Sequence, residues 1–147
     1  MIDKVIDHIR NHSYMSGSER DQLRIKATGE VFTPTPLVQK ILNEMPIELF
    51  QDPSKTFLDP SCGDGQFLGE VIIKKMENGS TFEQALGTTY GVELMLDNVL
   101  LTRERLLCGQ EHLRHIVENN IVNADALTYD YSFGEKTNKT MFADLFS

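Results

Sequence analysis

The sequence predicts an α/β protein built on a doubly wound parallel sheet, and two observations carry this prediction. From Thr56 onward, short apolar runs alternate with segments of helical periodicity, which is typical of βα units around a parallel sheet. The first of these runs ends at Asp59 and leads through a turn with two glycines into a helix. With 147 residues, of which 40% are apolar and 24% charged, the chain has the size of one domain with a real core.

The segment before the sheet is predicted to be helical, with residues 1–28 as an N-terminal extension. Its first helix has apolar residues at i, i+3, i+4 and i+7, and this stripe is expected to dock on the domain: Ile2, Val5, Ile6 and Ile9. Ser18 caps a second helix that continues to Lys26. Thr35 and Pro36 form the N-cap and first position of a third helix. We expect its buried face to consist of Leu37, Val38, Ile41, Leu42 and Met45.

Four short apolar runs are predicted to be the strands, at residues 56–59, 89–93, 121–125 and 141–146. Crossover helices are expected from Gln66 to Asn78 and from Met95 to Cys108, closed by Gly79 and Gly109. Between the second strand and the first crossover helix, Ser80 and Glu83 have the spacing of a capping box that begins a short helix.

Composition excludes several classes of protein. No stretch has the roughly 20 apolar residues of a membrane span, and the charged N-terminus has no secretory h-region, so we expect a cytoplasmic protein. Cys62 and Cys108 are too few for a disulfide framework and lack metal-ligand spacing, so no metal is predicted. The formal charge of −8 argues against tight, independent binding to nucleic acid, which depends on Lys and Arg.

Acidic residues follow three successive predicted strands: Asp59, Glu93 and Asp125. Any one of them could simply cap a turn. The carboxyl ends of parallel strands meet at one edge of a sheet, where such folds bind ligands, and the first acid precedes a turn containing Gly63 and Gly65. Glu93 is placed to accept the hydroxyls of a ribose, so the three acids together predict a nucleoside site. The spacing departs from the dinucleotide fingerprint, because a third glycine, Gly69, comes one residue late.

Four segments resemble the motifs of one family. Asp59 to Leu68, Asp-Pro-Ser-Cys-Gly-x-Gly-x-Phe-Leu, closely resembles motif I of the S-adenosylmethionine-dependent N6-adenine DNA methyltransferases. Gly29 to Pro34 resembles their motif X, Tyr90 to Leu94 motif II, and Asn123 to Ala126 motif III. The resemblance covers about residues 27–130, in the order and spacing of one subgroup of the family.

The resemblance implies a fold and a set of cofactor contacts. Residues 29–147 would form a truncated Rossmann-like class I methyltransferase domain of about four parallel strands in the order 3-2-1-4, binding S-adenosylmethionine or S-adenosylhomocysteine. The cofactor site implied in this way consists of Phe32, Thr33, Pro34, Asp59, Pro60, Ser61, Cys62, Gly63, Gly65, Phe67, Glu93, Leu94, Asp125 and Ala126. The first three would line the methionine end, and Asp59 with the glycine-turn backbone would hold the amino and carboxylate groups. Glu93 would bind the ribose, Asp125 the adenine amino group, and Leu94 and Ala126 the faces of the ring.

The catalytic motif of the family, Asn or Asp-Pro-Pro-Tyr or Phe after the fourth strand, is absent, so no catalytic residue is assigned. That motif holds the flipped adenine. We therefore expect a cofactor-binding part that transfers methyl groups, and contacts DNA, only with a partner chain. The alternative is a non-enzymatic S-adenosylmethionine-binding protein that acts by sequestration, sensing or assembly. The apolar run Met141 to Phe146 would lie at an open sheet edge, which predicts a homo-oligomer or a second chain paired there.

Overall fold

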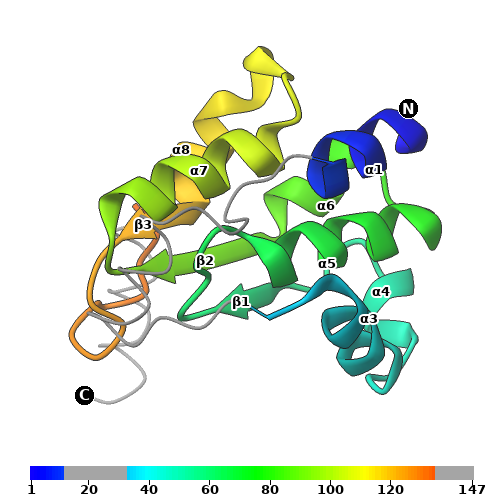
Figure 1. Ribbon diagram of the computed structural model, residues 1–147, viewed down its shortest axis with the longest axis horizontal. Helices are drawn as coiled ribbons and strands as arrows, with labels where there is room; N and C mark the ends of the chain where they lie inside the picture. Colours follow the sequence, from blue (N-terminus) through cyan, green and yellow to red (C-terminus); the bar gives the residue numbers. More distant parts are fainter. Residues whose placement is uncertain (12–32, 135–147) are drawn as a thin grey trace.

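The computed structural model describes residues 1–11 and 33–134, and within them the chain forms a parallel sheet with helices packed along it (Figure 1). The described strands are β1 (Phe57–Asp59), β2 (Thr89–Glu93) and β3 (Ile121–Asn123), in the order β1-β2-β3. The register pairs Asp59 with Gly91 and Glu93 with Asn123, so the strands end at one edge of the sheet. The expected fourth strand, Met141 to Phe146, lies outside the described residues, and the four-stranded order and the oligomer contact stay predictions.

The helices follow the alternation that the sequence predicts. Two long crossover helices, α5 and α7, pack against the strands, and α1 lies beside α5 (Figure 1). The helices and their bounds are α1 (Ile2–Asn11), α3 (Thr35–Asn43), α4 (Glu48–Gln51), α5 (Gln66–Glu77), α6 (Phe82–Gly87), α7 (Leu96–Leu107), the 3₁₀ turn η1 (Glu111–Leu113) and α8 (Arg114–Asn120). The second helix expected at residues 18–26 falls outside the described part of the chain.

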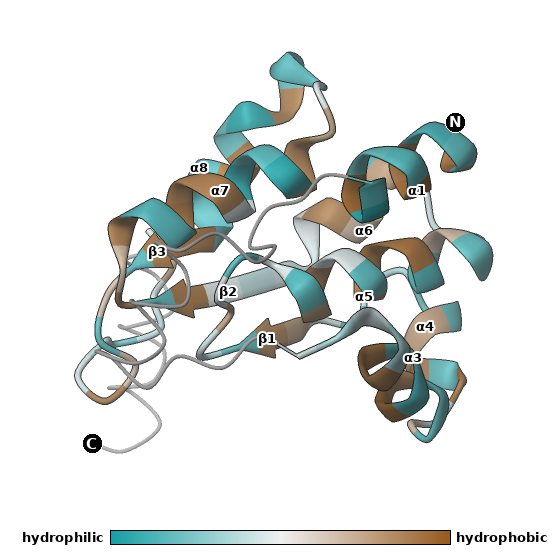
Figure 2. Cartoon of the chain, viewed as in Figure 1, coloured by the Kyte–Doolittle hydropathy of each residue, from teal (hydrophilic) through white to brown (hydrophobic). Residues whose placement is uncertain are grey.

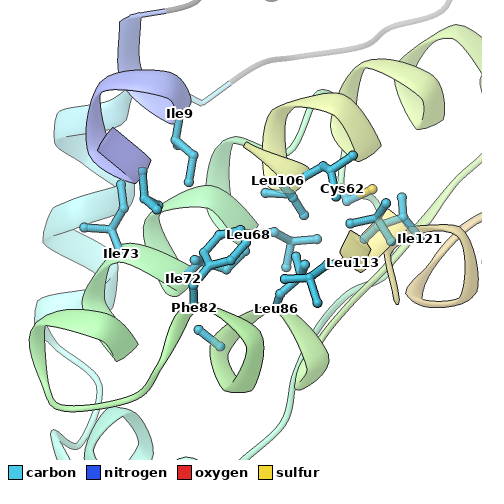
Figure 3. Close-up of a cluster of buried hydrophobic side chains, with 14 of the residues drawn as sticks. Ile9, Cys62, Leu68, Ile72, Ile73, Phe82, Leu86, Leu106, Leu113 and Ile121 are labelled. Atoms are coloured by element: carbon cyan, nitrogen blue, oxygen red, sulfur yellow. The ribbon is translucent and has the colours of Figure 1, made fainter. Parts of the chain in front are cut away.

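The main core gathers around α5. Leu68 and Ile72 from α5 meet Leu106 from α7 and Ile9 from α1 in one cluster of buried side chains (Figure 3). The predicted docking of the first helix is therefore confirmed. Gly69 explains how closely α1 approaches, because a Cβ at this position would lie 2.6 Å from Cγ2 of Ile9. The glycine that comes one residue late for a dinucleotide turn is thus a helix-packing glycine.

A second, smaller apolar cluster joins α3 and α4 to α5. It contains Val38, Leu42, Phe50 and Val71. The wide buried face predicted for α3 is wrong in part: Leu37 is 47% exposed and Ile41 38% exposed, because within the described residues α3 packs on α5 along one narrow side. The helix also begins one residue earlier than predicted, with Pro34 as its N-cap.

The capping box before α6 is shifted by one residue from its prediction. The Thr81 hydroxyl accepts the Gln84 amide at 3.1 Å, and the Gln84 side chain accepts the Thr81 amide at 2.9 Å. Ser80 and Glu83 have the same spacing, but Ser80 is buried and so does not form the cap.

Figure 2 shows hydrophilic and hydrophobic residues interleaved along the helices. Among the residues described, no helix is long and apolar enough to cross a membrane.

Candidate functional site

A cavity of about 340 Å³ lies at the carboxyl end of β1, between α3 and the first turns of α5. This volume is near the lower end of the range for small-molecule sites, about 300 to 1,000 Å³. Six of the predicted site residues line it: Thr33, Asp59, Ser61, Cys62, Gly63 and Phe67. The structure therefore brings together residues of the two segments that resemble motif X and motif I, which are separated by about 25 positions in the sequence.

The glycine turn between β1 and α5 is held from two sides. Gly63 and Gly65 have positive φ angles of 55° and 88°, conformations that only glycine adopts at little cost. The hydroxyl of Thr102, on α7, donates to the carbonyl of Gly63 at 2.8 Å. The amide of Cys62 donates to the carbonyl of Val92, on β2, at 3.1 Å. The turn is thus a fixed part of the fold before any ligand binds.

Helix α5 begins at this turn without a side-chain cap. Gly65 is its N-cap residue and makes no side-chain hydrogen bond to the first helical turn. The first amides of a helix have no partner within the helix, and the helix dipole places partial positive charge there. The N-terminus of this 12-residue helix is therefore suited to a carboxylate or another anionic group.

Asp59 lies beside the turn with an unusual electrostatic environment. Its Oδ1 accepts the backbone amide of Ser61 at 3.0 Å. Burial raises the pKa of the Asp59 carboxyl, and the nearby negative charge of Glu93 raises it further, against the lowering effect of the Ser61 amide. Within residues 1–11 and 33–134 no Lys or Arg forms an ion pair with either acid. Two neighbouring acids that have no basic partner in the part of the chain described are suited to a ligand that carries positive charge.

Glu93 is fixed at the tip of β2. Its side chain is 7% exposed, and Oε2 accepts the backbone amide of Met95 at 2.8 Å. Its carbonyl accepts the amide of Ala124 at 3.0 Å, which ties the tip of β2 to the segment after β3. A Cβ on Gly91 would lie 2.9 Å from Sγ of Cys62, so this glycine lets the turn approach β2 closely.

The remaining predicted contacts do not line the cavity. Asp125 is exposed and its Oδ1 accepts the amide of Leu127 at 2.9 Å, as in a turn. Leu94 is 65% exposed, and Ala126 is half-buried. Pro34, Pro60 and Gly65 are outside the lining although each is next to a lining residue in the sequence, and Glu93, at the tip of β2, is outside it as well. Phe32 lies outside the described residues.

Cys62 packs rather than reacts. It is 4% exposed, and burial raises the pKa of its thiol well above the usual range, so the sulfur stays protonated. Its Sγ lies against the space that a side chain at Gly91 would need. In the described parts of the chain no three His, Cys, Asp or Glu side chains gather as a metal site.

Sequence reasoning missed the residues that support the turn from behind. Arg105, on α7, is 4% exposed and forms an ion pair with Asp64, with 3.5 Å between Nη1 and Oδ2. It also donates to the carbonyl of Asp64 at 3.3 Å. An arginine beside Leu106 and Leu107 in a core helix is itself a signal, because a buried guanidinium requires partners. Spacing alone does not say that these partners lie in the glycine turn.

A comparison with protein families identifies the family of the chain. The family model of the N-6 DNA methylases matches residues 20–145. The chain belongs to this family. The resemblance predicted from the four motifs is thereby confirmed at the level of the family. N-6 DNA methylases generally use S-adenosylmethionine as methyl donor. No curated protein and no solved structure shows a significant match to the chain.

Proposed function

We propose that this N-6 DNA methylase chain binds S-adenosylmethionine at the carboxyl end of β1. The observation that carries the proposal is the pair of acids, Asp59 and Glu93, which lie close enough for one to raise the pKa of the other and have no basic partner among the described residues. S-adenosylmethionine carries an ammonium and a sulfonium group, so it would supply the missing positive charge.

The residues present fit the amino-acid end of this cofactor. Asp59 would accept the ammonium group, because its Oδ2 has no hydrogen-bond donor in the described chain. The uncapped first turn of α5 would receive the carboxylate. Thr33 and Phe67 would enclose the aliphatic part between α3 and α5. Phe32 and Pro34 would extend the same wall, as their place in motif X implies.

The nucleoside end of the cofactor would lie across the tips of β2 and β3. Glu93 would accept the ribose hydroxyls through the oxygen that does not bond Met95. Asp125 would accept the adenine amino group, with Leu94 and Ala126 on the two faces of the ring. The exposure of Asp125 and Leu94 is compatible with a ligand that covers them on binding. The bound cofactor supplies an electrophilic methyl group, and the role of these residues is to bind and orient it.

Methyl transfer to DNA needs groups that these 147 residues do not contain. No Asn-Pro-Pro or Asp-Pro-Pro sequence occurs in them, and the formal charge of −8 disfavours independent binding to DNA. We propose that the tetrad that holds the flipped adenine, and the DNA-binding surface, come from further residues of the protein or from a second chain. The acceptor would then be the N6 amino group of adenine.

Calorimetric titration of S-adenosylmethionine into the protein tests the binding proposal. We expect a micromolar Kd, which Asp59→Ala weakens at least about tenfold. ATP serves as a matched ligand, because it carries the same adenosine with negative instead of positive charge, and it should bind much more weakly. Absence of both heat and thermal shift with S-adenosylmethionine would contradict the proposal and leave the motifs as fold scaffolding.

The dependence on outside groups is tested by a methylation assay. The 147-residue protein is incubated with labelled S-adenosylmethionine and adenine-containing duplex DNA. We expect cofactor binding without transfer of label to DNA. Transfer by this chain alone would show that it contains a complete catalytic site. Binding without transfer under every condition, including in the presence of candidate partner chains, would favour a sensing or sequestering protein.

A further inference from the structure

A chain of polar contacts runs from the end of α1 to the start of α3 and passes behind the cavity. The Nε of Arg105 donates to the carbonyl of Ile9 at 3.0 Å, and its Nη2 donates to Oε1 of Gln66 at 2.6 Å. The other end of the same amide, Nε2 of Gln66, donates to the hydroxyl of Thr35. Four segments distant in sequence are thus joined through one glutamine.

The charged member of this chain of polar contacts, Arg105, is buried. Arg105 is 4% exposed, and each bonded nitrogen of its guanidinium faces a fixed acceptor, including the carbonyl of Asp64 in the glycine turn. A planar guanidinium presents its donors in fixed directions. Arg105 therefore fixes the amide of Gln66 relative to the glycine turn and to the last turn of α1.

Gln66 reaches the cavity in two ways. It is the first residue of α5 and lines the cavity itself. Through Thr35 it also holds the first turn of α3, two residues after Thr33 in the opposite wall. A change at Gln66 therefore alters the distance between the two walls that would enclose the methionine end of the cofactor.

A second bridge one turn further along α5 joins the same two helices. Glu70 is 4% exposed and accepts both Nε and Nη2 of Arg10, on α1, at 3.0 and 2.8 Å. It also accepts Nε2 of Gln39, on α3, at 3.0 Å. Gln66 and Glu70 are four residues apart and so lie on the same side of α5. Both bridges connect α1 to α3, but only the one through Gln66 touches the cavity lining.

We propose that Gln66 is a positioning residue of the cofactor site. Its hydrogen bonds to Arg105 and to Thr35 hold the first turn of α3, next to Thr33, against the start of α5. The inference rests on the proposed cofactor binding and deepens it: the affinity for S-adenosylmethionine depends on the hydrogen bonds of Gln66 to Arg105 and to Thr35.

Three variants test the link in the full chain, and the two at Thr35 form a matched pair. Gln66→Leu removes both hydrogen bonds at similar side-chain size. Thr35→Val removes only the hydroxyl, and Thr35→Ser retains it. We expect Gln66→Leu and Thr35→Val each to weaken the Kd for S-adenosylmethionine roughly three- to tenfold, the effect of one or two net hydrogen bonds. Thr35→Ser should bind as the unmodified protein does.

Hydrogen exchange provides a readout that does not depend on the ligand. The amide of Val38 donates to the carbonyl of Pro34 at 3.1 Å, so it reports on the first turn of α3. In the ligand-free protein, Gln66→Leu and Thr35→Val should speed exchange at Val38, while Thr35→Ser should not. If Gln66→Leu does not fold, Thr35→Val still tests the same contact.

The double variant Gln66→Leu/Thr35→Val decides whether the two residues act together. We expect it to bind about as weakly as the weaker single variant, because both substitutions break one link. Multiplied losses, or weaker binding with unchanged exchange at Val38, would overturn the inference. If the unmodified protein does not bind S-adenosylmethionine, the proposed function fails, and exchange at Val38 alone then decides whether Gln66 positions the wall.

Discussion

The tripeptide Asp-Pro-Ser occurs twice, once before β1 and once at its carboxyl end, and both copies form the same hydrogen bond between side chain and backbone in different surroundings. Asp52 accepts the backbone amide of Ser54 at 2.9 Å, and Asp59 accepts that of Ser61 at 3.0 Å. The local hydrogen bond is thus a property of the tripeptide, since a short acidic side chain readily bonds the backbone two residues ahead.

The surroundings give the two carboxyl groups opposite pKa shifts. The side chain and the backbone amide of Ser54 lower the pKa of Asp52, with smaller contributions from the positive charges of Lys55 and Lys75. Burial and Glu93 raise the pKa of Asp59. What differs is the neighbouring strand and helix. The tripeptide therefore forms its own hydrogen bond in either place, whereas burial and the neighbouring Glu93 determine the environment of the Asp59 carboxyl group.

The two ends of α5 show the same contrast. At the amino end of β1, the buried Lys75 donates to the carbonyl of Lys55 and to the hydroxyl of Thr88, both at 2.6 Å. Desolvation lowers the pKa of this lysine. This ammonium group is thus already engaged by the segments that lead into β1 and β2. At the carboxyl end, the first turn of α5 has no side-chain cap, and among the described residues neither Asp59 nor Glu93 forms an ion pair, so that end can receive a ligand.

The largest effect is expected from the same substitution in the two tripeptides. Asp59→Asn keeps an oxygen for the Ser61 amide but loses the charge that would hold the ammonium group. We expect the Kd for S-adenosylmethionine to rise about ten- to hundredfold, the range for a hydrogen bond to a charged group. Asp52→Asn should leave the Kd unchanged. Calorimetry on both variants measures the difference. An equal loss of affinity in both would contradict a specific role of Asp59 in binding.

The next effect concerns packing around the two ends of β1. Gly91 pairs with Asp59, and a Cβ there would lie 2.8 Å from Cδ1 of Leu68 in the core. Gly91→Ala should lower the free energy of unfolding by about 1 to 3 kcal/mol through overpacking. Gly87, near the other end of β1, has no atom within 4 Å of such a Cβ. Urea unfolding should therefore show Gly87→Ala to be neutral or slightly stabilising.

A smaller effect is expected at the tip of β3. Asp125 and Asp130 are both exposed, and each accepts a backbone amide two residues ahead, at 2.9 and 3.1 Å. Asp125→Asn should weaken binding of S-adenosylmethionine about two- to fivefold, because an exposed charge contributes little. Asp130→Asn is the control and should have no effect. A loss at Asp125 as large as that at Asp59 would mean that the nucleoside end is as enclosed as the methionine end.

The smallest expected effect is on stability, where the same substitution at Asp59 and at Asp52 should change the Tm in opposite directions. A raised pKa means that the folded state binds the Asp59 proton more tightly, so stability falls as pH rises from the ordinary value of 3.8 through the raised one. For Asp52, stability is present above the ordinary value and is lost as pH falls through the lowered one. At pH 7, Asp59→Asn should raise the Tm and Asp52→Asn should lower it. Thermal denaturation that gives the same sign for both would contradict these environments.

Local signals in the sequence predicted β1, the glycine turn and α5 well, because turn residues and apolar periodicity act within a few positions. The capping box failed by one residue, since Ser80 with Glu83 and Thr81 with Gln84 have the same spacing, and only the burial of Ser80 decides between them. The exposed side of α3 could not be predicted either. Its apolar residues do not reveal how narrow its contact with α5 is.

Of the candidate site, the sequence predicted the acids at the strand ends but not the residues that support the glycine turn. Asp59 and Glu93 are strand-end residues, so the order of elements places them. Thr102 and Arg105 support the turn from α7, about 40 positions further along the chain, and no spacing rule links them to it. Their roles follow from how α7 crosses behind α5, which is a matter of tertiary packing.

Binding of S-adenosylmethionine at the carboxyl end of β1 can be tested directly, because the two tripeptides provide one amide near each end of the strand. In a nitrogen-edited NMR titration, the amides of Ser54 and Ser61 report on equivalent hydrogen bonds to Asp52 and Asp59, at opposite ends of the strand. We predict that S-adenosylmethionine shifts the amides of Ser61 and Gly63 and leaves that of Ser54 in place. A titration that moves none of the three, or that moves Ser54 as far as Ser61, would contradict the claim.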